Sequence, residues 1–114
     1  MDLDKLKVYR DGQELLSETL SVLSRLPRGT GWLADQARRA ASSIPLNIAE
    51  GWGYPANGNR RRAFDVAIGS AHEPAACFEV AYRMGSISKD KFHRLWDQAD
   101  QITHMLGAMC KGLR

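Results

Sequence analysis

The chain is poor in the residues that stabilise many small proteins by covalent or metal bonds. Its only cysteines, Cys77 and Cys110, stand far apart and form neither a CxxC pair nor a Cys/His cluster. The first residues are charged and lack the apolar core of a secretion signal. Two isolated cysteines in an unexported chain are expected to be buried, small apolar residues in a reducing compartment. We therefore expect a cytoplasmic protein without disulfides.

Long apolar runs are also missing. No run approaches the roughly 20 residues that span a bilayer, so no membrane partner is expected. The chain has 114 residues, of which 44% are hydrophobic and 25% charged, as is ordinary for a globular protein. This length suits one hydrophobic core, which predicts a single domain over residues 1–114.

Recognisable catalytic patterns are absent as well. A di-metal helical bundle needs Glu-x-x-His pairs, and none of the three histidines has a glutamate three residues before it. The glycine-rich segment 51–55 lacks the Lys-Ser/Thr of a phosphate-binding loop. Ser70 and His72 are two residues apart and would point to different faces of a helix. We expect no enzyme, no metal centre and no cofactor.

No segment alternates with period two, whereas apolar residues recur at spacings of three and four. The pattern predicts a first helix over residues 3–26 and a second over the segment 33–53, which a turn at 51–58 closes. A third helix is predicted from an N-cap at Asn59 to Gly85, and a fourth from an N-cap at Ser88 onward. The first helix has its apolar residues at Leu6, Tyr9, Leu16, Leu20 and Leu23. Short connections favour an all-α fold, an antiparallel up-down four-helix bundle.

Two prolines fall inside predicted helices. Pro45 and Pro74 each remove one helical hydrogen bond and displace the carbonyl four residues before it, those of Ala41 and Ser70. We expect the second helix to be kinked at Pro45. The side chains of Ser42, Ser43 and Asn47 are candidates to satisfy polar groups freed near that kink.

The second helix also has an unusual polar side. Five polar residues follow helical spacing and form one polar stripe: Gln36, Arg39, Ser43, Asn47 and Glu50. The adjoining apolar stripe contains Leu33, Ala37, Ala40, Ile44 and Ile48. A continuous file of hydrogen-bonding and ionic groups beside a core predicts a polar contact with a neighbouring helix, another subunit or a ligand.

Positive charge is concentrated between residues 25 and 62. This window has seven arginines and two acidic residues, a net charge of +5, so the rest of the chain has −2. Arg60, Arg61 and Arg62 open the third helix, where cations oppose the helix dipole unless an anion compensates. We interpret these three, together with Arg38, as candidate contacts to nucleic-acid phosphate. A solvated or salt-bridged face, in which acids such as Glu50 pair with the arginines, explains the same residues.

The residues quoted above resemble a known family. The run Arg-Arg-Ala-x-x-Ser-Ile-Pro-x-Asn-Ile-Ala-Glu-Gly at 38–51, preceded by Leu6 to Tyr9 and followed by Phe64, Ala67 to Ser70 and Glu73, is similar to four-helix-bundle proteins encoded in intervening sequences of bacterial 23S rRNA genes. These proteins are related to the accessory variability determinants of diversity-generating retroelements. The matching positions are Gln36, Arg38, Arg39, Ser43, Pro45, Asn47, Glu50, Gly51, Ser70 and Glu73.

The resemblance implies a bundle that assembles into a ring of five copies and has no assigned molecular function. The retroelement relatives bind nucleic acid and a reverse transcriptase, so RNA or DNA, and more remotely a reverse transcriptase, are implied as partners. The chain departs from these relatives at residues 74–76, where they have an acid- and leucine-rich helix, and at residues 55–58, where they have a more basic loop. The polar stripe and Glu73 are expected to hold subunits together, or to carry a structural role within one chain.

Overall fold

The computed structural model describes residues 2–55 and 57–113. Over these residues it contains a short 3-10 helix, Leu3–Lys5, and four α-helices, namely α1 (Lys7–Leu23), α2 (Gly31–Gly53), α3 (Asn57–Arg83) and α4 (Lys89–Lys111), with no strand. The predicted all-α four-helix fold is therefore confirmed. None of the helices in the described part of the chain is long and apolar enough to cross a membrane.

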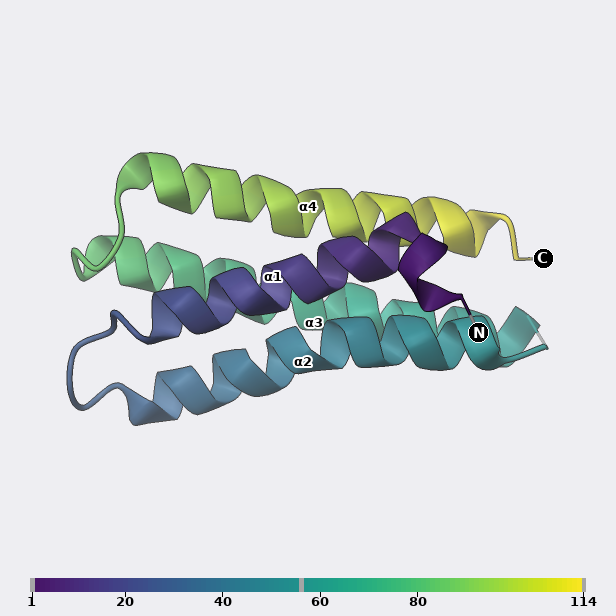
Figure 1. Ribbon diagram of the computed structural model, residues 1–114, viewed down its shortest axis with the longest axis horizontal. Helices are drawn as coiled ribbons and strands as arrows, with labels where there is room; N and C mark the ends of the chain where they lie inside the picture. Colours follow the sequence, from purple (N-terminus) through teal and green to yellow (C-terminus); the bar gives the residue numbers. More distant parts are fainter. Residues whose placement is uncertain (1, 56, 114) are drawn as a thin grey trace.

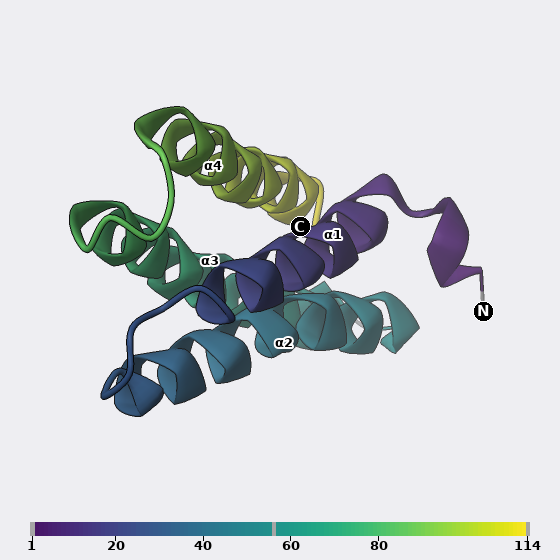
Figure 2. The same ribbon diagram turned by 60° about the vertical axis from the view of Figure 1, so that its left-hand side comes forward.

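The helices lie side by side in an elongated bundle of 44 × 24 × 21 Å. Figure 1 shows successive helices running in opposite directions along the long axis. The 24–30 and 84–88 connections lie at one end of the bundle, and the α2–α3 connection lies at the other. Viewed after a 60° turn, α1 lies over α2 and α4 over α3 (Figure 2). The most extensive contact in the bundle joins α2 to α3.

The core runs along the bundle axis and takes one stripe from each helix. Its largest fully buried side chains include Leu15, Ile44, Phe64, Phe78 and Leu106. Burying such side chains contributes about 1.5–3 kcal/mol each relative to exposure, which accounts for the stability of helices that are individually marginal.

The apolar stripe predicted for the first helix is right at Leu23, which is buried, and at Leu6 and Tyr9, which pack against the core, but it is wrong at Leu20. Position Leu20 is 43% exposed, and the buried residues of α1 are Val8, Gly12, Leu15, Thr19, Val22 and Leu23. Gly12 belongs there because a Cβ at this position would lie 3.3 Å from Ile44 Cγ2, so its absence lets α1 approach α2. Thr19 is buried without penalty because its hydroxyl donates to the Leu15 carbonyl at 2.7 Å.

Helix boundaries follow the sequence prediction at two places, Ser88 and Gly85, and depart from it at a third. Ser88 caps α4 as predicted, since its hydroxyl accepts from the Lys91 N–H at 3.1 Å. Gly85 has φ +80° and ends α3, and the N–H groups of Gly85 and Ser86 donate to the carbonyls of Tyr82 and Ala81 in a Schellman motif. Asn59 is not an N-cap, because α3 begins at Asn57.

Pro45 and Pro74 both lie inside continuous helices, and both are buried. The polar side chains around Pro45 do bond to backbone carbonyls, although not to that of Ala41. The hydroxyl of Ser42 donates to the Arg38 carbonyl at 2.7 Å, and Asn47 Nδ2 donates to the Ser43 carbonyl at 2.8 Å. The kink at Pro45 stays a prediction.

Gly51 was expected in the closing turn of the second helix, but it lies buried in the last turn of α2. A Cβ at this position would lie 2.7 Å from Cε1 of Phe64, which is 1% exposed, and 3.1 Å from the Ala63 Cβ. Real Cβ atoms essentially never approach that closely. Only glycine therefore allows α3 to pack this tightly against the end of α2.

We expect Gly51→Ala to lower the free energy of unfolding by about 1–3 kcal/mol, because the buried Phe64 ring would have to move. The matched control is Gly107→Ala in α4, where no atom lies within 4 Å of the added Cβ. There, better helix propensity should raise stability by up to about 1 kcal/mol. Urea denaturation of both variants checks the pair. Equal effects at the two sites would contradict the packing argument.

Candidate functional site

The polar stripe of α2 lies along the seam between α2 and α3. At its centre Ser70 Oγ on α3 lies 3.0 Å from Ser43 Oγ, and Asn47 Nδ2 donates to the same Ser43 oxygen at 2.8 Å. All three side chains are partly buried. The predicted contact of the stripe with a neighbouring helix is thus present at its middle, where small hydroxyls let the two helices lie close together.

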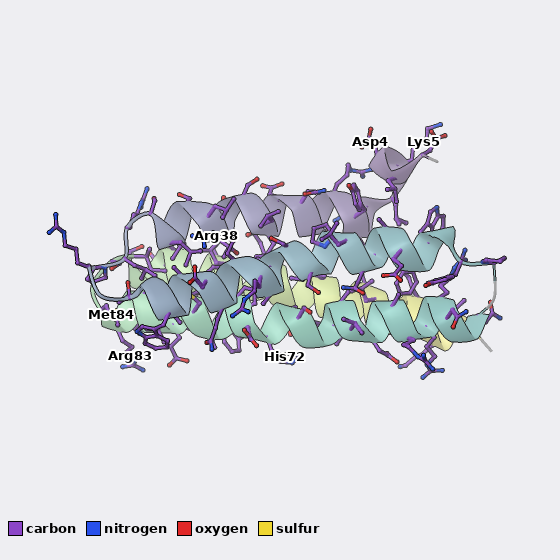
Figure 3. The ribbon with its side chains drawn as sticks, turned by 90° about the horizontal axis from the view of Figure 1, so that it is seen from below. Asp4, Lys5, Arg38, His72, Arg83 and Met84 are labelled. Atoms are coloured by element: carbon purple, nitrogen blue, oxygen red, sulfur yellow. The ribbon has the colours of Figure 1, made fainter. Side chains whose placement is uncertain are left out.

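Two shallow hollows open on either side of this centre, and Val66 lines both. We call the surface that contains them the α2–α3 face; Figure 3 looks onto it, with Arg38 near its edge toward α1 and His72 on the far edge of α3. The first hollow is lined by Gln36, Arg39, Ala40, Val66, Gly69, Ser70 and Glu73. The second hollow is lined by Asn47, Glu50, Tyr54, Asn59, Arg62, Ala63 and Val66.

Each hollow contains one arginine and one glutamate. Arg39 and Glu73 line the first, and Glu50 and Arg62 line the second. Within the part of the chain that the structure describes, none of these four forms an ion pair. The face therefore presents two positive and two negative side chains that form no ion pair among the described residues.

Local hydrogen bonds hold two of these four side chains. Arg39 Nε reaches the Asp35 carbonyl at 3.4 Å, and the Tyr54 hydroxyl donates to Glu50 Oε1 at 2.8 Å. The hydrogen bond to Glu50 raises the pKa of Tyr54, and the nearby charge of Arg62 opposes that shift. Arg62 therefore lies near Tyr54 and Glu50 in the second hollow.

Exposed apolar side chains accompany the charges. Val66 is 47% exposed between the two hollows, and Leu46, on the outer side of α2 between Arg39 and Glu50, is 67% exposed. Gly69 adds no side chain to the first hollow, and no atom lies within 4 Å of the position of a Cβ there. A mixed surface of this kind, with an apolar centre and charges toward both ends, is typical of a protein contact.

Arg60 has a defined role inside the subunit. Its guanidinium donates to three carbonyls at the C-terminal end of α2, those of Gly51 (3.0 Å), Trp52 (3.0 Å) and Tyr54 (2.8 Å). It also lies 5.1 Å from the centroid of the Trp52 ring. The negative end of the α2 dipole thus compensates a cation that is unfavourable at the start of α3.

The three consecutive arginines do not form one patch, because successive residues of a helix point about 100° apart. Arg60 is bound to the end of α2, and Arg62 lines the second hollow. Arg61 is exposed on the side toward α4, where its charge acts on the Cys110 thiol. Arg38 forms an exposed ion pair with Asp35 at 3.0 Å. The four predicted phosphate contacts therefore lie in four different settings.

The other candidate chemical groups lie apart from this face. Cys77 and Cys110 are free and buried, as predicted, and burial raises the pKa of both thiols. The three histidines are exposed. No group of three or more potential metal ligands occurs among residues 2–55 and 57–113.

Comparisons with known proteins agree on one family. A family model described as "23S rRNA-intervening sequence protein" matches residues 4–108. The chain is also similar to a solved structure from Bacteroides thetaiotaomicron, a protein of unknown function assigned to the S23 ribosomal protein family. The two share 18% sequence identity over 91% of this chain and 98% of the other, with a TM-score of 0.80. No curated protein matches the chain.

The structure predicts that Arg60 stabilises the subunit. We expect Arg60→Ala to cost about 2 kcal/mol of unfolding free energy, because three carbonyls lose a charged donor. Arg60→Lys should recover only part of the loss, since an ammonium lacks the planar fork. Arg61→Ala is the control and should stay within about 0.5 kcal/mol of the original chain. Chemical denaturation measures all three, and an unchanged stability for Arg60→Ala would refute this role.

Proposed function

The chain belongs to the 23S rRNA-intervening sequence protein family, and from that premise we propose that it is a non-enzymatic, cytoplasmic protein that assembles with copies of itself through the α2–α3 face. The observation that carries the proposal is that the four charged side chains of this face form no ion pair among the described residues. Arg39, Glu50, Arg62 and Glu73 have no ionic partner within the described residues, although each lies in a hollow beside an opposite charge.

Exposed apolar area supports the same function. Val66 and Leu46 stay in contact with water in the subunit, and burying them against another chain removes that area from solvent. The charges would then set the orientation of the contact, since electrostatic complementarity contributes more to specificity than to affinity. Five copies is the number that the sequence resemblance implies.

Nucleic-acid binding is a second candidate function, favoured by one observation. Of the seven arginines between residues 25 and 62, only Arg38 forms an ion pair among the described residues, and only Arg60 is bound by several carbonyls. The other five are exposed: Arg25, Arg28, Arg39, Arg61 and Arg62. Exposed arginines without acidic partners are able to bind phosphate groups. Among residues 60–62, Arg61 is the one that neither binds the α2 carbonyls nor lines a hollow.

Self-assembly predicts a mass above that of one chain at micromolar concentration. We expect Arg39→Ala to shift the protein toward the single chain, because the opposing carboxylate of another subunit would lose its partner and be desolvated unpaired. Arg38→Ala, which removes an exposed arginine one residue away, should leave the mass unchanged. Multi-angle light scattering over a concentration series measures both. A single-chain mass for the original protein at every concentration would end the proposal.

If the arginines bind phosphate, affinity for mixed-sequence RNA should fall steeply as salt rises, through counterion release. Replacing both Arg61 and Arg62 by Ala should then reduce the magnitude of the slope of log affinity against log salt by about 1.4–1.8. Arg60→Lys keeps the net charge and should leave the slope unchanged. Fluorescence anisotropy from low to moderate salt gives the slopes, and absence of binding at low salt would exclude this second function.

A further inference from the structure

The charge pattern on the outer side of α2 is repeated, with opposite signs, on a second surface of the subunit. We infer that α2 of one copy packs in parallel against α4 of the next copy, so that two different surfaces of the chain meet head to tail. The inference rests on the proposed function and specifies the surface that the α2–α3 face binds. Three residues of each helix carry it: Arg39, Leu46 and Glu50 on α2, and Asp100, Gly107 and Lys111 on α4.

The outer side of α2 has one apolar residue between two opposite charges. Leu46, which is 67% exposed, follows Arg39 by seven residues and precedes Glu50 by four. Seven and eleven residues make about two and three helical turns, so the three side chains lie on one side of the helix. From N- to C-terminus the order is positive, apolar, negative.

The side of α4 toward α3 has the same spacing with the charges exchanged. Asp100 lines a groove between α3 and α4 together with Ala75. Gly107 and Lys111 follow Asp100 by seven and eleven residues, on the same side of the helix. No atom lies within 4 Å of the position of a Cβ at Gly107, so the surface is open there. Among the described residues Lys111 forms no ion pair, and Asp100 contacts only the His104 ring, at 3.5 Å, as an ion pair when that ring is protonated.

The first residues of the two patterns lie at the same height along the bundle. Arg39 shares the first hollow with Glu73 of α3. Asp100 shares the α3–α4 groove with Ala75, only two residues further along α3. The same short stretch of α3 therefore lies beside Arg39 on one side and beside Asp100 on the other.

The last residues of the two patterns also lie at one height. Glu50 shares the second hollow with Arg62 of α3. The thiol of Cys110, the residue before Lys111, lies 3.8 Å from Oδ1 of Asp65, three residues further along α3. The two patterns thus match in spacing and in their position along the bundle axis.

A simple rotation brings the two patterns together. Helices α2 and α4 run in the same direction, because successive helices alternate (Figure 1). A rotation about an axis parallel to the bundle moves no residue along that axis, so α2 of one copy and α4 of the next stay in register. Three contacts result: Arg39 with the partner's Asp100, Leu46 with the partner's Gly107, and Glu50 with the partner's Lys111.

The charges determine the direction of the contact. If α4 of the partner subunit ran antiparallel to α2, Arg39 would face the partner's Lys111, and Glu50 would face the partner's Asp100. Both pairs have like charges, which an interface disfavours strongly. The contact therefore joins two different surfaces of parallel copies, which is the heterologous kind that builds rings.

The two surfaces lie on adjacent sides of the bundle and share α3 as their border. His72 marks this border, since it lies on the far edge of α3 in Figure 3 and lines the α3–α4 groove. Surfaces on opposite sides would build a straight row of copies, whereas surfaces on adjacent sides turn each copy relative to the last. Repeating this turn closes a ring, such as one of five copies, with α3 nearest its axis.

The same register gives partners to the other two charges of the α2–α3 face. In this arrangement the α3 helices of neighbouring copies lie side by side at the same height. The α4 side of α3 contains Asp65 and His72, seven residues apart. Arg62 therefore lies within one turn of the partner's Asp65, and Glu73 lies beside the partner's His72. Each of the four charges of the face then meets a complementary group.

The test exchanges charges without changing the net charge. The α2 variant is Arg39→Asp/Glu50→Lys, and the α4 variant is Asp100→Arg/Lys111→Glu. Each variant alone places like charges in both ion pairs, and its self-association should weaken at least tenfold. The chain with all four substitutions opposes unlike charges again and should recover its association. Light scattering over a concentration series measures association, and circular dichroism confirms that each variant is folded.

A mixture gives a second measurement that does not need the fourfold variant. The α2 and α4 variants, combined in equal amounts, should associate with each other, because each altered surface then meets its altered counterpart. Native mass spectrometry identifies the mixed species. The matched control exchanges the same residue types on α1, Arg10→Asp/Glu14→Lys, at two exposed positions outside the contact. It should associate like the original chain.

Recovery of association in the fourfold variant or in the mixture supports the parallel α2–α4 contact. Normal association of the α4 variant alone, or failure of both combinations to associate, overturns this contact while leaving self-assembly intact. A single-chain mass for the original protein at every concentration overturns both.

Discussion

The close approach of α2 and α3 is the constraint on which the rest of the structure depends. At one end the buried Phe64 ring occupies the space that any side chain at position 51 would need. In the middle Ser43 and Ser70 share a hydrogen bond. At the same end as Gly51, the Arg60 guanidinium binds the last carbonyls of α2. A glycine, two small hydroxyls and one arginine thus fix a single register between the two helices.

That register determines what the surface can do. Because the helices are antiparallel and held at three points, charges eleven residues apart on each helix fall into two hollows of mixed sign. Inside the subunit, none of these four charged side chains forms an ion pair among the described residues. They are well placed to orient another molecule. The residues that fix the α2–α3 packing therefore also place the four charges on which the proposed assembly rests.

The sequence predicted the number and type of helices, the Ser88 cap, the Gly85 stop and the burial of both cysteines, because each depends on local spacing or composition. It missed Gly12 and Thr19 in the buried stripe of α1, since these two are core residues only in the presence of α2 and of a backbone acceptor. It also treated residues 60–62 as one basic cluster. The helix directs Arg60, Arg61 and Arg62 to three different surroundings, which composition alone does not reveal.

The sequence by itself determined an all-α chain, a polar stripe on the second helix and a local excess of arginine, because helical periodicity and net charge are properties of residue order. Only the tertiary structure decided which charges meet. Whether Arg39 lies beside Glu73, and Arg62 beside Glu50, depends on the direction and register of α3 against α2. Steric fit at Gly51 and the hydrogen bonds of Arg60 set that register. Both contacts join a residue of α3 to the end of α2, and neither is visible in the periodicity of a single helix.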